Sequence, residues 1–208
     1  MRCEIDHLVV TAPSLRSGGD YVKAILGVAP GPGGAHPRMG THNLLLRLDG
    51  SIFLEVIAPD PAAPRPGRPR WFGLDEAATL QAPRLAAWVA RTDDLRACPD
   101  DVLAECGLVE TMTRGTLEWL ITIPAGGRLP FAGALPMVIE WQQPRAPAGA
   151  GLPEAGCALA ALGVRHPEPA RVEALLARMG FEGRVALEAG DPGLWADIAT
   201  PAGVRRLG

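Results

Sequence analysis

The sequence has little of what marks a nucleic-acid-binding, membrane or disulfide-rich secreted protein. Lys23 is the only lysine, and the net charge of −3 gives no general attraction to nucleic acid or to an anionic membrane. No run approaches the roughly 18 apolar residues of a membrane span, and the charged start of the chain lacks the apolar stretch of a signal peptide. The four cysteines, Cys3, Cys98, Cys106 and Cys157, form no closely spaced metal or redox motif. We therefore expect a cytoplasmic protein with reduced cysteines and without nucleic-acid or membrane partners.

The composition is that of an ordinary globular chain. Of 208 residues, 48% are hydrophobic and 21% are charged, a balance typical of soluble domains. The 25 glycines and 21 prolines predict many turns.

The first 60 residues predict a strand, a helix, a loop and a hairpin. Ser14 is a good helix N-cap and Gly27 a good C-cap. Asp49-Gly50 between two apolar runs is a strong hairpin signal. The predicted elements are the strand Ile5–Val10, the helix from Ser14 to Gly27, the loop Pro30–Gly40 and the strands Thr41–Leu48 and Ser51–Ala58. The proline-rich stretch from Pro59 to Pro69 is read as a connecting arm.

The same pattern recurs farther along the chain. Strands are predicted at Arg84–Ala90, Leu108–Thr113, Thr116–Ile123 and Met137–Trp141, with a helix from Asp93-Asp94 to Gly107 and a linker at Pro144–Pro153. Glu55 and Glu140 stand at matching places, each inside a hydrophobic closing strand. A third, partial copy is predicted from strands at Cys157–Val164, Arg184–Glu188 and Trp195–Ala199 and a helix at Pro169–Met179. This organisation predicts an α+β fold of paired βαβββ modules at 1–60 and 84–144, an arm at 61–83 and a partial βαββ extension at 153–208.

Strand parity suggests where the polar side chains point. A two-residue turn at Asp49-Gly50 would place Leu44 opposite Glu55, so that His42 and Glu55 share one face of the hairpin. His7 and Glu140 are likewise ionisable groups within aliphatic strands. A buried charge needs a partner, so each is expected to meet a metal, a cation or a hydrogen-bonding group.

These residues resemble the glyoxalase-like domain family of the vicinal oxygen chelate superfamily, over roughly the first 180 residues. The resemblance lies in four segments, Ile5–Val10, Gly40–Asn43, Leu54–Ile57 and Arg68–Asp75. It implies paired βαβββ modules that curl around an open cleft, where a divalent metal often chelates two neighbouring oxygens of a substrate. Carried over by position, His7, Glu55 and Glu140 are the implied metal ligands. Ala87 stands where relatives carry a fourth ligand.

Each candidate also has a structural interpretation. His7 could be a core histidine bonded to backbone, Glu55 could pair with Arg47 or Arg70, and Glu140 could act as a base or bond the cleft wall. His42 is expected to serve as an extra ligand, a base or a substrate contact. Asn43, Arg70 and Trp71 are candidate substrate contacts, and the alternative for the last two is an arm packed on the sheet. His36 is interpreted as a solvated loop residue, and His166 as a turn residue.

The predicted function is that of a divalent-metal-dependent lyase, isomerase or dioxygenase acting on a small oxygen-rich molecule. His and carboxylate ligands with open positions suit Fe, Mn, Ni or Zn. The first alternative is a metal-free protein of the same fold that binds or sequesters a small molecule. The second is an extradiol-type Fe(II) dioxygenase, which needs two histidines and one carboxylate. A monomer and a homodimer are both compatible with the sequence.

Overall fold

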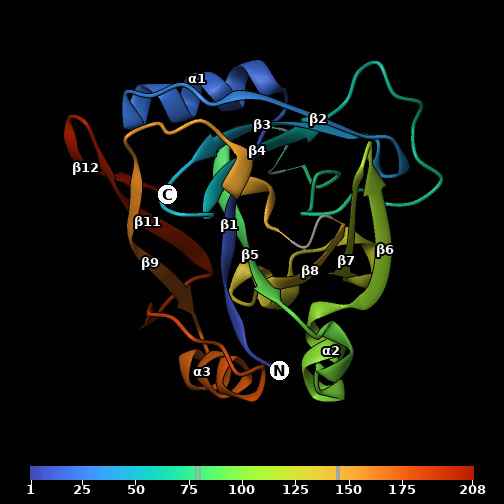
Figure 1. The fold of residues 1–208 in the computed structure, drawn as a ribbon. Coiled ribbons are helices and arrows are strands. Elements are labelled where there is room, and N and C mark those ends of the chain that lie inside the picture. Colours follow the sequence, from blue (N-terminus) through green and yellow to red (C-terminus); the bar gives the residue numbers. More distant parts are fainter. Residues whose placement is uncertain (78, 80, 144–145) are drawn as a thin grey trace.

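Two β-sheets and three α-helices make up the fold. The structure is a computed structural model, and it describes residues 1–77, 79, 81–143 and 146–208. One sheet of eight strands has the order β2-β3-β4-β1-β5-β8-β7-β6, and a second sheet of four strands has the order β10-β9-β11-β12. The large sheet curls around an interior, with α1 along its outer side, and the second sheet flanks it (Figure 1). The predicted α+β fold of paired modules in a half-open barrel is confirmed.

The large sheet is built from two units of like topology. The strands of the first are β1 (Cys3–Thr11), β2 (Gly31–His36), β3 (Thr41–Arg47) and β4 (Phe53–Pro59). Those of the second are β5 (Arg84–Thr92), β6 (Leu108–Arg114), β7 (Leu117–Ile123) and β8 (Met137–Gln143). In each unit the first strand pairs in parallel with the last, and β1 joins β5 antiparallel at the centre. Each unit therefore contributes half of the wall around the interior.

Local signals explain the helices well. The helix α1 (Leu15–Leu26) begins with a capping box, in which the Ser14 and Ser17 side chains each bond to the other's backbone N–H, and it ends at Gly27 with φ of 74°. The predicted second helix is split into a 3-10 turn, Leu95–Ala97, and the short helix α2 (Asp100–Cys106). Pro99 lies between them, and proline cannot donate the backbone hydrogen bond that a continuous helix needs.

The C-terminal part forms its own sheet. It comprises β9 (Ala158–His166), α3 (Pro169–Arg178), β10 (Val185–Ala189), β11 (Gly193–Thr200) and β12 (Gly203–Leu207). Here the first strand lies between β10 and β11, so the strand order differs from that of the two modules. The last strand, β12, was not predicted. Among the described residues, no helix is long and apolar enough to cross a membrane.

The curled sheet separates two apolar clusters. The outer cluster packs the sheet against the helices and the second sheet, through residues such as Leu8, Val22 and Leu54. The inner cluster fills the curl and includes Ala87 and Ile139. The face on which a strand residue lies therefore decides whether its side chain reaches the interior.

The hairpin register differs by one residue from the prediction. Leu48 N–H donates to Ile52 O and Ile52 N–H to Asp49 O, so the loop holds three residues with Gly50 at φ of 54°. Glu55 consequently lies opposite Leu45, not Leu44. A one-residue change of register exchanges the two faces of a strand. Asn43, and not His42, therefore shares the face of Glu55.

Two segments that were read as loops carry structure. The predicted loop Pro30–Gly40 contains the edge strand β2 and a 3-10 turn, Pro37–Met39. An edge position tolerates the proline and glycines of β2. The predicted linker Pro144–Pro153 starts with residues 144 and 145, which lie outside the described residues, and continues into a 3-10 turn at Ala148–Gly151.

Candidate functional site

A cavity opens into the interior of the curled sheet. The space between its atoms is about 420 Å³, including the part open to solvent, and the centre of a water molecule can occupy about 40 Å³ of it. Both modules line it, together with the arm between them. The polar lining residues are His7, His36, Asn43, Glu55 and Arg114, and the aromatic ones are Phe53, Trp71, Phe72, Trp119 and Trp141. An apolar cavity with a few convergent polar groups is the usual form of a small-molecule site.

His7 reaches this cavity because of a β-bulge. On the neighbouring strand Ile5 pairs with Ala90 and His7 with Val89, which leaves Asp6 as the extra residue. A bulge re-aims side chains, and the result is that these sequence neighbours touch: His7 Nδ1–H donates to Asp6 Oδ1 over 2.6 Å. Asp6 is fully buried. In a neutral ring this tautomer leaves the lone pair on Nε2.

Asp6 is itself held in place from the second module. The indole N–H of Trp141 donates to its other oxygen, Oδ2, over 3.0 Å, and the guanidinium of Arg91 lies 3.8 Å away. The His7 ring stacks on Phe53, with ring centroids 4.5 Å apart. The orientation of the imidazole is therefore fixed by a carboxylate at one edge and an aromatic ring on one face.

Glu55 faces the free nitrogen of His7. Its Oε2 lies 3.6 Å from His7 Nε2, while its Oε1 accepts a 2.5 Å hydrogen bond from the amide of Asn43. The amide oxygen of Asn43 in turn accepts from Gly34 N–H over 2.7 Å. The partner expected for Glu55, Arg47 or Arg70, is replaced by an amide. His7 and Glu55 thus present two acceptor atoms to a donor or a cation placed between them.

His36 also lines the cavity, contrary to its interpretation as a solvated loop residue. It is only 5% exposed, and its Nδ1 bonds Thr41 Oγ1 over 3.2 Å. Burial, and secondly the nearby Arg114, lower the pKa of His36 from 6.5 to about 3. His36 is therefore neutral at physiological pH. The same hydroxyl of Thr41 accepts a hydrogen bond from the indole of Trp71, which also lines the cavity.

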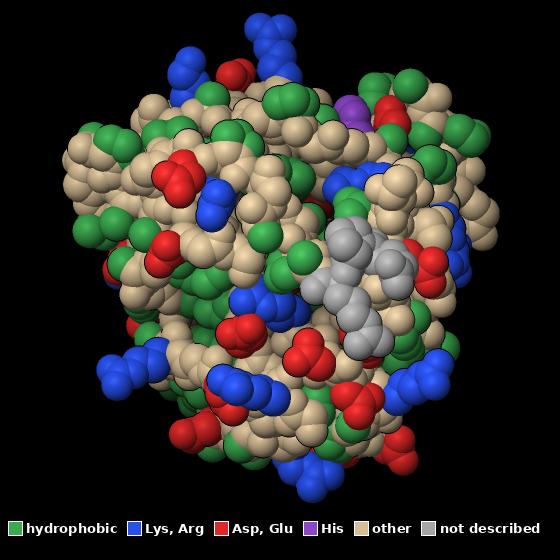
Figure 2. Space-filling view, in the orientation of Figure 1, with side chains coloured by type: hydrophobic (Ala, Val, Ile, Leu, Met, Phe, Trp, Pro, Cys, Tyr) green, Lys and Arg blue, Asp and Glu red, His purple; other side chains and the backbone are tan. Residues whose placement is uncertain are grey.

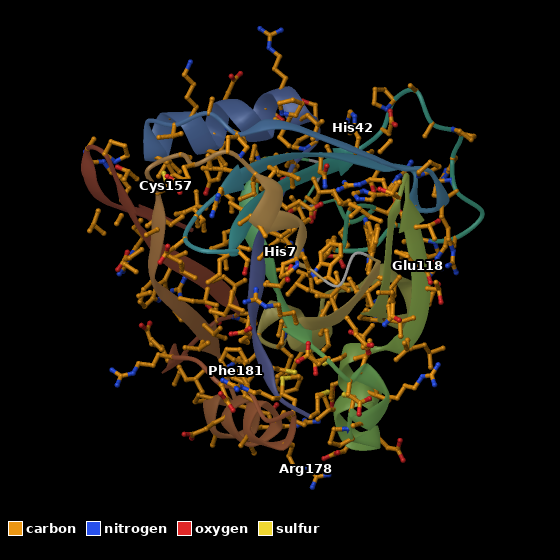
Figure 3. All side chains as sticks on the ribbon, viewed as in Figure 1. His7, His42, Glu118, Cys157, Arg178 and Phe181 are labelled. Carbon is orange, nitrogen blue, oxygen red and sulfur yellow. The ribbon has the colours of Figure 1, made fainter. Side chains whose placement is uncertain are left out.

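His42 lies on the other face of its strand. It shares that face with Leu44, which approaches α1, and it is absent from the cavity lining. Figure 3 shows His42 on the outer side of the sheet and His7 within the curl. The carboxylate nearest to His42 is Asp60, 3.9 Å away. The expectation that His42 faces the site was wrong because the hairpin loop has three residues, not two.

Glu140 also lies outside the cavity. Its neighbours on β8, Ile139 and Trp141, line the cavity, so Glu140 points to the opposite face. Its Oε2 accepts from Leu95 N–H over 2.7 Å, at the start of the 3-10 turn, and its Oε1 accepts from Gln142. Glu140 therefore bonds a turn, and the match of Glu55 with Glu140 was wrong: Glu55 lies opposite Val9 in the first module, whereas Met137 lies opposite Val89 in the second.

Arg70 is used within the arm. Its backbone N–H and Nη1 donate to the two oxygens of Asp75, over 2.8 and 2.6 Å, and its Nε donates to Gly40 O. It does not line the cavity. The cation that does is Arg114, at the end of β6, which sequence reasoning missed because nothing local marks it; only the fold brings β6 beside β2.

A metal centre of the kind implied by the family resemblance does not fit these residues. His7 Nε2 and Glu55 Oε2 could hold a divalent ion from the first module. The corresponding inner positions of the second module are apolar, namely Ala87, Ile139 and Trp141. In the part of the chain that the structure describes, no three His, Cys, Asp or Glu side chains gather as a metal site. Half of the expected ligand set is in place.

Comparisons with known proteins agree with this architecture. A hypothetical protein from Staphylococcus aureus superposes with a TM-score of 0.63 at 13% identity, covering 92% of this chain and 88% of that one. Two further structures superpose more loosely. Methylmalonyl-CoA epimerase in complex with methylmalonyl-CoA and NH4+ gives a TM-score of 0.46 at 14% identity, covering 67% of this chain and 94% of that one. A mutant of 4-hydroxymandelate synthase from Streptomyces coelicolor gives a TM-score of 0.45 at 16% identity, covering 97% of this chain and 60% of that one.

At 13% identity, the likeness to the Staphylococcus aureus protein shows the fold alone, and the two looser superpositions carry no argument. No protein of curated function matches the sequence significantly. The profile of the glyoxalase-like domain matches residues 5–180, most of the chain. The chain belongs to the glyoxalase-like domain family.

Proposed function

We propose that the protein is an enzyme of the lyase or isomerase type that moves a proton on a small oxygen-rich substrate, with His7 as the base. The observation that supports this is the Asp6–His7 pair, which aims His7 Nε2 at Glu55 inside the cavity. A base needs a free lone pair, a fixed orientation and a place beside the substrate. The hydrogen bond to Asp6, made possible by the bulge in β1, would give the ring its tautomer and its orientation. The cavity would give it a place beside the substrate.

The roles of the neighbouring groups follow from their positions. Asp6 is a positioning residue that keeps the Nδ1–H tautomer and would stabilise positive charge on the ring after proton transfer, as in other carboxylate–histidine pairs. Glu55 would stabilise the same charge from the other side, or take the proton onward over the 3.6 Å that separates it from Nε2. Asn43 fixes the orientation of Glu55.

Metal-dependent chemistry, the first expectation, receives less support from the donor set. A divalent ion would supply Lewis-acid polarisation of substrate oxygens, but His7 and Glu55 are the only ligands that the described part of the chain offers it. We therefore assign no step to a metal. Extradiol cleavage by Fe(II) is weakened further. The second histidine proposed for it, His42, lies on the outer face, and both ring nitrogens of His36, which does line the cavity, contact Thr41 and Arg114.

The test is solvent deuterium incorporation. The protein is incubated in D2O with small 1,2-diketones and α-hydroxyketones, and exchange at carbon is followed by NMR. We expect the wild-type protein to catalyse exchange and H7Q to lose it. H42Q is the matched control, a histidine on the same sheet but outside the cavity, and it should keep the wild-type rate. Equal exchange by H7Q and wild type would overturn the role of His7.

A second function is supported by a different observation. Five aromatic side chains surround the cavity, and the second module contributes only apolar groups from β5 and β8. Such walls would also suit a protein that binds a small molecule without transforming it. Ligand binding without any exchange in the D2O assay, across the whole panel, would favour this function.

A further inference from the structure

Arg114 differs from the other arginines around the cavity in its partners. Arg38 and Arg68 both bind Glu110, and Arg70 binds Asp75. The guanidinium of Arg114, partly buried in the cavity wall, has no carboxylate within ion-pair distance among the residues that the structure describes. Its polar neighbours are His36 Nε2 and Asn43 Oδ1, each 3.4 Å from Nη1. Both contacts are longer than a good charge-assisted hydrogen bond.

The neighbours of Arg114 leave its charge uncompensated. His36 accepts from Arg114 as a neutral ring, and the Asn43 oxygen already accepts a shorter bond from Gly34 N–H. Gly34 also makes room for the side chain, since a Cβ there would lie 3.0 Å from Arg114 Cδ. A cation in a low-dielectric wall is costly unless it is paired. The site is therefore built to receive an anion.

The remaining walls describe the rest of the ligand. Phe53, Trp71, Phe72 and Trp119 present flat aromatic surfaces. Phe72 is only 2% exposed and holds a left-handed backbone, with φ of 56°, which is strained for a bulky residue. Strain of this kind is kept where the surroundings fix it, commonly at ligand sites. Planar apolar ligands stack on such walls.

We infer that the cavity selects a small aromatic monocarboxylate, with its carboxylate on the Arg114 guanidinium and its ring against the aromatic walls. The planar fork of arginine matches a carboxylate. A single charge is favoured, because Arg114 is the one arginine or lysine in the cavity lining among the described residues, and the Glu55 carboxylate in that lining would repel a dianion. This inference rests on the proposed function in using the same cavity, and it names the class of substrate.

Isothermal titration with benzoate, benzamide, acetate and inorganic phosphate tests the inference. Benzamide has the shape of benzoate without its charge, and acetate has the charge without the ring. We expect benzoate to bind the wild-type protein at least about tenfold more tightly than any of the other three. In R114Q the preference for benzoate over benzamide should disappear, and in R114K it should be partly kept.

R206Q is the matched control, because Arg206 pairs with Asp197 on the second sheet, away from the cavity. It should bind benzoate as the wild type does. Equal binding of benzoate and benzamide by the wild type, undiminished preference in a folded R114Q, or no benzoate binding at millimolar concentration would each overturn the inference. Tighter binding of phosphate would assign the subsite to a different anion and would also overturn it. Since binding is measured without turnover, any of these failures leaves the result of the D2O assay standing.

Discussion

The Nδ1 of His7 donates to Oδ1 of Asp6, its immediate neighbour in the sequence, over 2.6 Å. Adjacent residues of a regular strand point to opposite faces. The contact exists because Asp6 is the extra residue of a β-bulge, anchored from the second module by Trp141. The catalytic proposal depends on this local irregularity, which ties a residue of one module to the other.

Replacing Asp6 by Asn should impair the base without unfolding the protein. The amide can donate to Nδ1 as well as accept from it, so His7 loses its fixed tautomer. We expect D6N to slow deuterium exchange on the order of 100-fold, within the usual range for positioned acid–base groups. ¹⁵N NMR of the histidines should show the Nδ1–H form of His7 in the wild type and a mixture in D6N. An unchanged tautomer and an unchanged exchange rate in D6N would contradict the role of Asp6.

The register of the β3–β4 hairpin can be tested by stability. Asn43 is 5% exposed and bonds both Glu55 and Gly34, so N43L removes a hydrogen-bond partner from the buried Glu55 carboxylate and from the partly buried Gly34 N–H. We expect N43L to lower the free energy of unfolding by about 1–3 kcal/mol. H42L, on the outer face, should change it by no more than about 0.5 kcal/mol. Urea unfolding of both variants decides the point, and the reverse order of effects would restore the predicted two-residue turn.

His36 predicts a pH dependence of stability. Burial lowers its pKa in the folded state to about 3, against 6.5 for an exposed imidazole. Below pH 6.5 the unfolded chain therefore binds a proton that the folded chain refuses, so stability falls as the pH drops from 6.5 toward 3. The variant H36Q should show a shallower decline over this range in thermal unfolding. Parallel curves for H36Q and wild type would show that His36 is free to take up a proton in the folded protein.

Glu110 lies on the edge strand β6 and binds two arginines from outside its module, Arg38 after the other edge strand, β2, and Arg68 in the arm. Its carboxylate accepts two 2.6 Å hydrogen bonds from Arg68 and also binds Arg38. Bonding to Arg68 holds the pKa of Glu110 below its ordinary value of 4.5. Its contribution to stability is thus present above pH 4.5 and is lost as the pH falls through the lower folded-state pKa.

We expect E110Q to be less stable than the wild type at pH 7, with the difference shrinking in acid. Thermal unfolding at several pH values measures it. The matched control is E118Q, also on the second module, for which no ion pair occurs among the described residues. A constant difference between E110Q and wild type down to pH 3 would contradict the ion-pair account. On the face that Figure 2 shows, acidic and basic side chains are interspersed. We therefore expect the pH dependence of stability there to reflect individual ion pairs and not the electrostatic field of one large charged patch.

Local patterns predicted the fold well and the site only in part. The caps at Ser14 and Gly27 and every strand of the two modules except β2 follow from signals within a few residues of each element. His7, Glu55, Asn43 and Trp71 were proposed from the sequence and line the cavity. What failed depends on single-residue register: the three-residue hairpin loop excluded His42, and the parity of β8 excluded Glu140. Arg114 and the contact of Asp6 with His7 arise from packing between the modules, which no local pattern contains.

In the proposed mechanism, His7 and Glu55, half of the usual ligand set, work as a proton-transfer site without a resident metal. The most direct test is elemental analysis of protein purified without chelators and without a tag that leaches metal. The account predicts a transition-metal content far below stoichiometric, in wild type and in H7A alike, in folded protein that still binds benzoate. A stoichiometric transition metal in the wild type, lost in H7A, would contradict it.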